Sequence, residues 1–132
     1  MEVRRVFSGA PWEAQVGYCR AVRSGSFVAV SGTAPVAEGG GVHAPGDAYL
    51  QARRCLEIAE RALRELGAER KHVIRTRMFV TDIARWAEYG RAHREFFADH
   101  PPATSMVQVS ALIDAQMLIE IELDAVIGAD HP

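Results

Sequence analysis

The chain has 132 residues, 48% of them hydrophobic and 24% charged, with 15 basic side chains against 17 acidic ones. This length and composition predict a soluble single domain over residues 1–132, because no apolar run approaches the roughly 20 residues that a membrane helix requires. The balanced charge excludes the basic stripe of a nucleic-acid surface, and the charged N-terminus, with no apolar segment behind it, favours a cytoplasmic protein.

The first third of the chain predicts short strands followed by a long loop. β-type runs occupy residues 4–7, 21–23 and 27–31, and Ser24-Gly25-Ser26 is a turn that joins the last two runs into a hairpin. Residues 34–46, APVAEGGGVHAPG, have the glycine and proline content of an exposed loop with room for a short edge strand.

The clearest predicted element is a helix that follows Asp47, a residue type that caps helix N-termini, and ends before Gly67. Apolar residues recur inside it at spacings of three and four, which places them on one face. They are Ala52, Cys55, Leu56, Ala59, Ala62, Leu63 and Leu66. The opposite face is rich in Arg and Glu, and we expect it to be solvated and salt-bridged, without a function of its own.

The second half of the chain predicts another helix set among strands. A strand covers residues 73–81, and a helix over 86–98 ends at Pro101-Pro102. Two further strands cover residues 103–109 and 118–126. Because the helices are separated by strands and strand pairs, we predict an α+β fold in which a mixed sheet carries both helices on one face.

The last predicted strand alternates apolar and acidic side chains, so Glu120, Glu122 and Asp124 point away from the helices. Arg75 and Arg77 share one face of the strand at 73–81. Opposite charges on neighbouring strands stabilise a sheet by about 0.2–1 kcal/mol per pair, so we expect these arginines to pair with the acids. Apolar residues share this uncovered face, which predicts that another subunit covers it.

Cysteine and histidine spacing indicates no metal or redox centre. Cys19 and Cys55 lie far apart without a CxxC motif, and His93 lies on the apolar side of its predicted helix, as core histidines do. We therefore predict neither a metal ion nor an organic cofactor.

Several segments, taken together, resemble the Rid family, also called YjgF or L-PSP-like. They are APWEAQVGYCRAVRSG at 10–25, FVAVSGTAP at 27–35, GD at 46–47, RMFVTDIARW at 77–86, HREFF at 93–97, PPATSMVQV at 101–109 and IEIELDAV at 119–126. The resemblance implies a chorismate-mutase-like fold, a homotrimer with the sheets inside, and a small-molecule pocket at each subunit seam. It also implies a deaminase-type hydrolysis of reactive enamines and imines to ketoacids and ammonia.

The same resemblance implies one catalytic residue and a set of ligand-binding residues. Glu120 matches the family's glutamate that helps to place the attacking water. The implied ligand-binding residues are Tyr18, Ser31, Gly32, Thr33, Thr104, Met106 and Arg91. Met106 stands where many members have cysteine, and Thr104 stands where archetypal members have the arginine that binds the substrate carboxylate.

The threonine at position 104 changes the expected substrate. An arginine holds a carboxylate through two charge-assisted bonds of roughly 1.5–3 kcal/mol each, whereas a threonine hydroxyl supplies one bond of about 0.5–1.5 kcal/mol. Either the ligand is neutral at that end, or Arg20 or Arg91 reaches the pocket instead. A third alternative is that Thr104 is a plain β-branched strand residue in an inactive homologue.

Two interpretations of Glu120 stay open, because it could place water or could pair structurally with Arg75 or Arg77. The sequence thus predicts a small-molecule protein with inter-subunit pockets that hydrolyses an enamine or imine, with a substrate range altered by Thr104. The alternatives are a ligand-binding trimer without catalysis and, disfavoured by the charge balance, an endoribonuclease.

Overall fold

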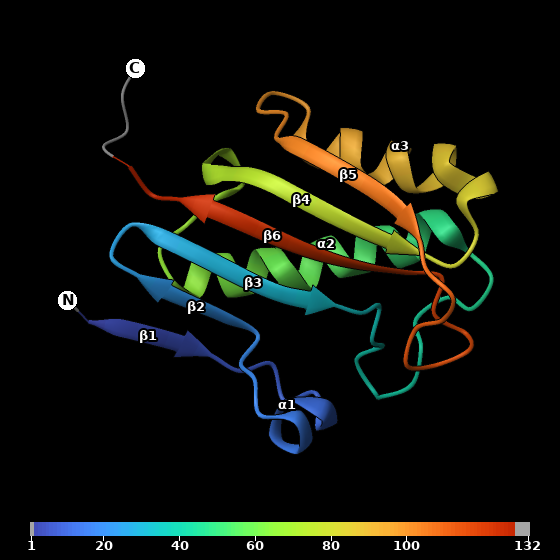
Figure 1. The fold of residues 1–132 in the computed structure, drawn as a ribbon, viewed down its shortest axis with the longest axis horizontal. Helices are drawn as coiled ribbons and strands as arrows, with labels where there is room; N and C mark the ends of the chain where they lie inside the picture. The colour runs from blue at the N-terminus through green and yellow to red at the C-terminus, as the bar shows by residue number, and fades with distance from the viewer. Residues whose placement is uncertain (1, 129–132) are drawn as a thin grey trace.

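One six-stranded sheet organises the computed structural model, which describes residues 2–128 (Figure 1). Met1 and residues 129–132 of the predicted domain lie outside the described residues. The elements in chain order are β1 (Val3–Val6), α1 (Pro11–Val16), β2 (Ala21–Ser24), β3 (Phe27–Thr33), α2 (Ala48–Glu65), the 3₁₀ turn η1 (Arg70–His72), β4 (Val73–Val80), the 3₁₀ turn η2 (Ile83–Arg85), α3 (Trp86–Phe97), β5 (Ala103–Gln108) and β6 (Ile119–Val126).

The strands lie in the order β1-β2-β3-β6-β4-β5, with β1 and β5 at the two edges. β5 runs parallel to β4, and the other neighbouring pairs are antiparallel. Parallel neighbours need a long crossover, and α3 provides it between β4 and β5. The predicted mixed α+β sheet and its hairpin of β2 and β3 are confirmed.

Helices α2 and α3 cover the same face of the sheet, as predicted (Figure 1). β6 shows this sidedness most clearly, because Ile119, Ile121, Leu123 and Ala125 are fully buried under the helices, while the acidic residues between them are only half-buried. We call the side of the sheet that carries Glu120, Glu122 and Asp124 the open face.

The helix that follows Asp47 forms as predicted. The Asp47 carboxylate accepts a hydrogen bond from the Leu50 amide at 2.8 Å, and every apolar residue predicted for the core face is buried. Within residues 2–128, no helix is both long and apolar enough to cross a membrane.

Two local features differ from the sequence-based expectation. The short helix α1 was not predicted, because six residues are too few to show a helical period. Pro11 starts it, and Gly17 ends it with φ 89°, a left-handed conformation that glycine adopts without strain. In the loop at 34–46, the suggested edge strand is reduced to a single bridge between Val36 and Val42.

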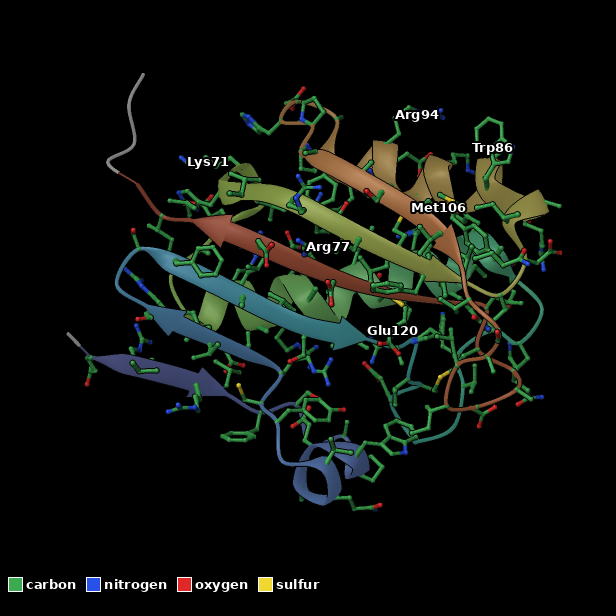
Figure 2. The ribbon with its side chains drawn as sticks, viewed as in Figure 1. Lys71, Arg77, Trp86, Arg94, Met106 and Glu120 are labelled. Atoms are coloured by element: carbon green, nitrogen blue, oxygen red, sulfur yellow. The ribbon has the colours of Figure 1, made fainter. Side chains whose placement is uncertain are left out.

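The charge pairs predicted for Arg77 form on the open face. Arg77 donates to the Glu122 and Asp124 carboxylates, each at 3.2 Å, and Figure 2 shows Arg77 over the sheet. The β4–β6 register also sets Arg75 opposite Asp124. Phe27 and Val107 lie on the same face and are 45% and 46% exposed, so an apolar surface surrounds the paired charges.

A bulge in β3 sets the geometry of the cleft described below. Val30 pairs with Leu123, and Thr33 pairs with Ile121, so β3 has one more residue than β6 between these two pairs. The extra residue places Ser31 and Gly32 against the stretch of β6 that carries Glu120 and Glu122. Bulges of this kind re-aim side chains and are common beside functional sites.

Candidate functional site

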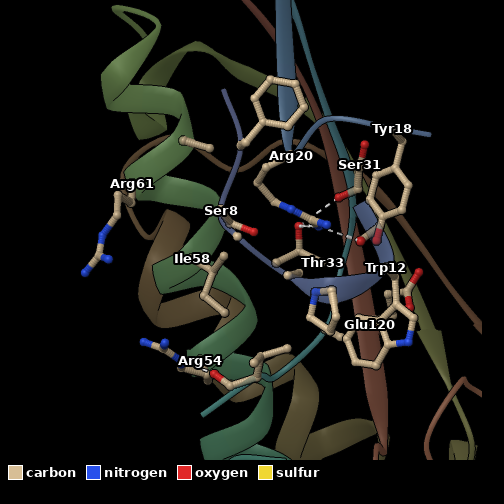
Figure 3. Close-up of a pocket in the computed structure, with 18 of the residues that line it drawn as sticks. Ser8, Trp12, Tyr18, Arg20, Ser31, Thr33, Arg54, Ile58, Arg61 and Glu120 are labelled. Carbon is tan, nitrogen blue, oxygen red and sulfur yellow. Dashed lines mark hydrogen bonds between the residues drawn. The ribbon is translucent and has the colours of Figure 1, made fainter. Parts of the chain in front are cut away.

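A cleft of about 1520 Å³ opens where the end of β3 meets α1 and the outer face of α2 (Figure 3). Its lining includes Ser8, Trp12, Tyr18, Arg20, Ser31, Gly32, Thr33, Arg54, Ile58, Arg61, Glu120 and Glu122. In Figure 3, α2 forms one wall, Tyr18 and Glu120 lie on the opposite side, and Arg20 lies between them. Five of the eight residues assigned to the site from the sequence therefore line one cleft.

A buried ion pair holds the centre of the cleft together. Arg20 and Glu13 are each 4% exposed, and Arg20 Nε lies 3.3 Å from Glu13 Oε2. One guanidinium nitrogen, Nη1, also donates to the Gly32 carbonyl at 2.7 Å and to Thr33 Oγ1 at 3.0 Å. Arg20 therefore links α1 to the β3 bulge.

Glu13 stays ionised in this setting. Burial opposes its ionisation, but hydrogen bonds from the Ser8 hydroxyl and amide, together with the charge of Arg20, outweigh burial and lower the pKa of Glu13. The negative charge of Glu13 in turn compensates the buried guanidinium, as a buried charge requires.

Glu120 lies directly over Gly32. A Cβ atom at position 32 would come within 2.1 Å of Glu120 Oε1, a distance that no side chain tolerates. Gly32 is thus the residue that allows the backbone of β3 to approach the carboxylate this closely. The β3 bulge and the missing side chain together fix where the Glu120 carboxylate sits.

Glu120 differs electrostatically from its neighbours on β6. Glu122 and Asp124 share Arg77, whereas among residues 2–128 Glu120 has no hydrogen bond or ion pair. Burial is the largest cause that raises the pKa of Glu120, the charge of Glu122 adds to it, and the charge of Arg20 opposes it. The structural pairing considered for Glu120 is therefore absent from the described chain, and its carboxylate is free for a ligand or a water molecule.

The hydroxyl groups around Glu120 differ in how much hydrogen-bonding capacity remains. Ser31 Oγ donates to the Cys19 carbonyl at 2.7 Å and can still accept a bond. Thr33 Oγ1 is buried, accepts from Arg20 and donates to the Ser31 carbonyl at 2.7 Å, so it supports the cleft from beneath. Tyr18 is half-buried, with its ring centroid 5.4 Å from Cζ of Arg20.

Three of the residues assigned from the sequence lie elsewhere in the chain. Thr104 and Met106 are on β5, in register with the buried Thr76 and Met78, so they face the helix side of the sheet and not the open face. Arg91 stacks over the Tyr49 ring, with Cζ 3.7 Å from the ring centroid, and does not line the cleft. Of the two arginines considered as substitutes for the missing one, Arg20 lies in the cleft and Arg91 does not.

Sequence reasoning missed several contributors to the cleft. Glu13 and Ser8 were not singled out, although Pro11 and Gly17 are start and stop signals that could have revealed α1. The polar face of α2 was expected to have no function, yet Arg54, Glu57 and Arg61 line the cleft. Their Arg and Glu pattern is the same as that of a solvated face, so it could not reveal that these residues line the cleft.

Comparison with known proteins identifies relatives over nearly the whole chain. The family model described as endoribonuclease L-PSP matches residues 8–127. Rv2704 of Mycobacterium tuberculosis, a member of the YjgF/YER057c/UK114 family, has a solved structure with TM-score 0.86 and 43% identity, covering 96% of this chain and 100% of that one.

Two further relatives have informative names. The 3-aminoacrylate deaminase RutC of Acinetobacter baylyi is 34% identical over 104 residues, which cover 79% of this chain and 82% of RutC. TdcF of E. coli, solved with bound serine, has TM-score 0.77 and 31% identity, covering 93% of each chain.

Replacement of the glycine under Glu120 tests how the carboxylate is held. In Gly32→Ala, the new methyl group should push the Glu120 carboxylate aside, while the free energy of unfolding changes by less than about 1 kcal/mol because only the end of a flexible side chain moves. A crystal structure gives the carboxylate position, and urea unfolding gives the stability. Gly39→Ala is the control, since nothing lies within 4 Å of a Cβ there; an unmoved Glu120 in Gly32→Ala would contradict the contact.

The two glutamates of β6 should respond oppositely to neutralisation. Because the pKa of Glu120 is raised in the folded state, stability falls as pH rises from the ordinary glutamate pKa to the raised one, and the loss is complete above it. Glu120→Gln should therefore be as stable as wild type or more stable near pH 8, with the difference vanishing towards pH 4. Glu122→Gln loses the bond to Arg77 and should be less stable by about 0–1 kcal/mol near pH 8. Thermal unfolding at matched concentration distinguishes the two, and equal destabilisation would assign Glu120 a structural role.

Proposed function

The chain belongs to the endoribonuclease L-PSP family, which includes YjgF and RutC relatives, and on this basis we propose that it is a homotrimer that hydrolyses a small enamine or imine at pockets between its subunits. The observation that carries the proposal is the Glu120 carboxylate, which lies over Gly32 in the cleft with a raised pKa and without a hydrogen bond or ion pair to any of residues 2–128. A carboxylate with a raised pKa is a stronger base than an ordinary glutamate and is suited to take a proton from water.

The positions of the assigned residues support a pocket shared between subunits. Glu120, Tyr18 and Ser31 line the cleft, whereas Thr104 and Met106 lie at the β5 edge and face the opposite side of the sheet. The two groups cannot meet within one chain. They can meet if the β5 edge of one subunit packs beside the cleft of the next, and the apolar surface around Phe27 and Val107 on the open face provides a surface for such packing.

The proposed reaction needs no group beyond water and the side chains of the cleft. An enamine tautomerises to its imine, water adds to the C=N carbon, and Glu120 takes a proton from that water. That proton passes to the nitrogen and gives an amino alcohol. The hydroxyl proton of the amino alcohol then passes to the same nitrogen by way of Glu120, the C–N bond breaks, and ammonia and a carbonyl compound are released. Tyr18 and Ser31 would orient the polar atoms of the substrate, and Arg20 would stabilise the ionised form of Glu120 through its charge.

The substrate class follows from the charge at both ends of the pocket. Glu38, Glu57, Glu65, Glu120 and Glu122 line the cleft, whereas its guanidinium groups are Arg20, Arg54 and Arg61. Arg20 is neutralised by Glu13, and Thr104 brings a neutral hydroxyl from the other half-site. We therefore propose that the preferred substrate has a neutral oxygen at the Thr104 end and tolerates a carboxylate there only weakly.

Two relatives support a small polar ligand. RutC is named for deamination of 3-aminoacrylate, and TdcF binds serine, so relatives at 34% and 31% identity act on or bind small polar molecules. The second candidate function is ligand binding without turnover, which Thr104 favours if the family's arginine is required for catalysis. RNA cleavage is disfavoured, because carboxylates outnumber guanidinium groups along the cleft.

The trimer is tested through the open face. Light scattering coupled to size exclusion should give the mass of three chains, and Val107→Glu should reduce it to one chain, because a charge would be buried where subunits pack. Leu50→Glu, which changes an exposed apolar residue on α2, is the control and should leave the trimer intact. A wild-type protein with the mass of one chain would exclude the shared pocket.

Thr104→Arg tests the substrate assignment. Wild type should release ammonia slowly from 3-aminoacrylate, and Thr104→Arg should raise kcat/KM by about fivefold to thirtyfold, as expected when a charge-assisted bond replaces a neutral one. The added Glu120→Gln change should abolish the gain, and Thr104→Gln, which is long but uncharged, is the matched control. No activity in wild type or in Thr104→Arg would favour the binding protein over the enzyme.

A further inference from the structure

A polar chain of three side chains lies outside the cleft, on the helix side of the sheet near its β5 edge. His93 Nε2 lies 2.8 Å from Thr76 Oγ1, and Thr76 Oγ1 lies 2.6 Å from Thr104 Oγ1. The three residues come from α3, β4 and β5, so one hydrogen-bonded chain crosses three elements.

Thr104 is the most exposed member of these three side chains. Thr76 is completely buried, His93 is half-buried against Phe97, with 4.7 Å between the ring centroids, and Thr104 is exposed on the edge strand. Within residues 2–128, the Thr76 hydroxyl is the hydrogen-bond partner of the His93 ring. The direction of the hydrogen bond between His93 and Thr76 therefore affects whether the Thr104 hydroxyl can donate to solvent or to a ligand.

The geometry couples the His93 tautomer to the direction of the Thr104 hydroxyl. A hydroxyl has one proton to donate, so Thr76 donates to one neighbour and accepts from the other. If His93 Nε2 carries a proton, it donates to Thr76, Thr76 donates to Thr104, and the Thr104 O–H is free to point outward. If Nε2 is bare, each donation reverses and Thr104 offers only an acceptor.

His93 is neutral in this environment, because burial lowers the pKa of its ring. A neutral imidazole has one nitrogen that donates and one that accepts, so the direction of the chain is set by which nitrogen carries the proton. The two arrangements require no movement of heavy atoms, only a redistribution of three protons.

We infer that His93 is a positioning residue for Thr104, which carries its proton on Nε2 and, through Thr76, turns the Thr104 hydroxyl outward as a hydrogen-bond donor to an oxygen of the ligand. This inference rests on the proposed function, since it places Thr104 at the ligand. It explains how an uncharged residue offers a donor of fixed direction: with the proton on His93 Nε2, the Thr76 hydroxyl donates to Thr104 and the Thr104 hydroxyl donates outward. The ligand class that fits is one with a neutral carbonyl oxygen at this end, and a carboxylate oxygen, which also accepts a hydrogen bond, is held there more weakly than by an arginine.

The first arm of the test reads the chain directly, without a ligand. ¹⁵N NMR of the His93 ring at fixed neutral pH should show a protonated Nε2 in wild type. Thr104→Val removes the acceptor of the Thr76 proton and should shift the population towards the Nδ1–H tautomer. Phe96→Leu, a packing change on the same helix, should leave the tautomer unchanged. A bare Nε2 in wild type would overturn the inference.

The second arm uses serine and serinamide as probes, because a carboxylate can only accept a hydrogen bond, whereas an amide can also donate. Calorimetry should show that Thr104→Val and His93→Leu each weaken serine binding by about threefold to tenfold, the worth of one neutral hydrogen bond. Serinamide should lose less in His93→Leu, because it can bind to either direction of the hydroxyl. His93→Gln, whose amide can still donate to Thr76, should recover most of the serine affinity.

The outcomes separate this inference from the proposed function. If Thr104→Val weakens serine binding but His93→Leu does not, the positioning role is wrong and the pocket assignment stands. If serine binds neither wild type nor Thr104→Arg, the proposed ligand site is wrong, and the positioning role falls with it. Equal losses for both probes in His93→Leu would mean that the chain supports packing and does not direct the hydroxyl.

Discussion

The buried bond between Arg20 and Glu13 is the interaction on which the cleft depends. It joins α1, which has too few residues to be stable alone, to the bulge of β3, and the same guanidinium holds the Gly32 carbonyl and the Thr33 hydroxyl. Removing either partner would leave an uncompensated charge inside the protein, at a typical cost of about 3–5 kcal/mol. The same network fixes the backbone of the β3 bulge at Gly32, over which the Glu120 carboxylate lies.

Glu120, the proposed catalytic group, differs from the acids beside it on β6. Glu122 and Asp124 lie on the same strand and the same face, but Arg77 compensates both of them. Glu120 instead faces the missing side chain of Gly32, and burial and the charge of Glu122 raise its pKa. A group kept in this state destabilises the folded chain slightly, as is common where reactivity is required.

The sheet separates the candidate site into two halves. Residues around Glu120 line the cleft, and Thr104 with its buried partners lies at the β5 edge on the helix side. Period-two alternation makes this separation unavoidable, because residues in register on neighbouring strands share a face. An assembly of several chains is the arrangement that can bring such halves together, and the uncovered open face is consistent with one.

The sequence by itself determined the elements whose periodicity is strong. The sequence predicted the apolar face of α2, the Asp47 cap, the alternation in β6 and the pairing of Arg77 with the acids of β6. Each of these features depends on neighbours along the chain or on a simple strand register. Family resemblance added Tyr18, Ser31, Gly32, Thr33 and Glu120, which share one cleft.

Only the tertiary structure decided which groups meet across the fold. Four features depend on contacts between segments that are distant in the sequence. Glu13 neutralises Arg20, and Gly32 lies beneath Glu120. The charged face of α2 lines the cleft, and Thr104 bonds to Thr76 and does not face Glu120. A sequence pattern records which face a side chain occupies, but a bulge, a crossover helix and the order of strands decide what that face touches.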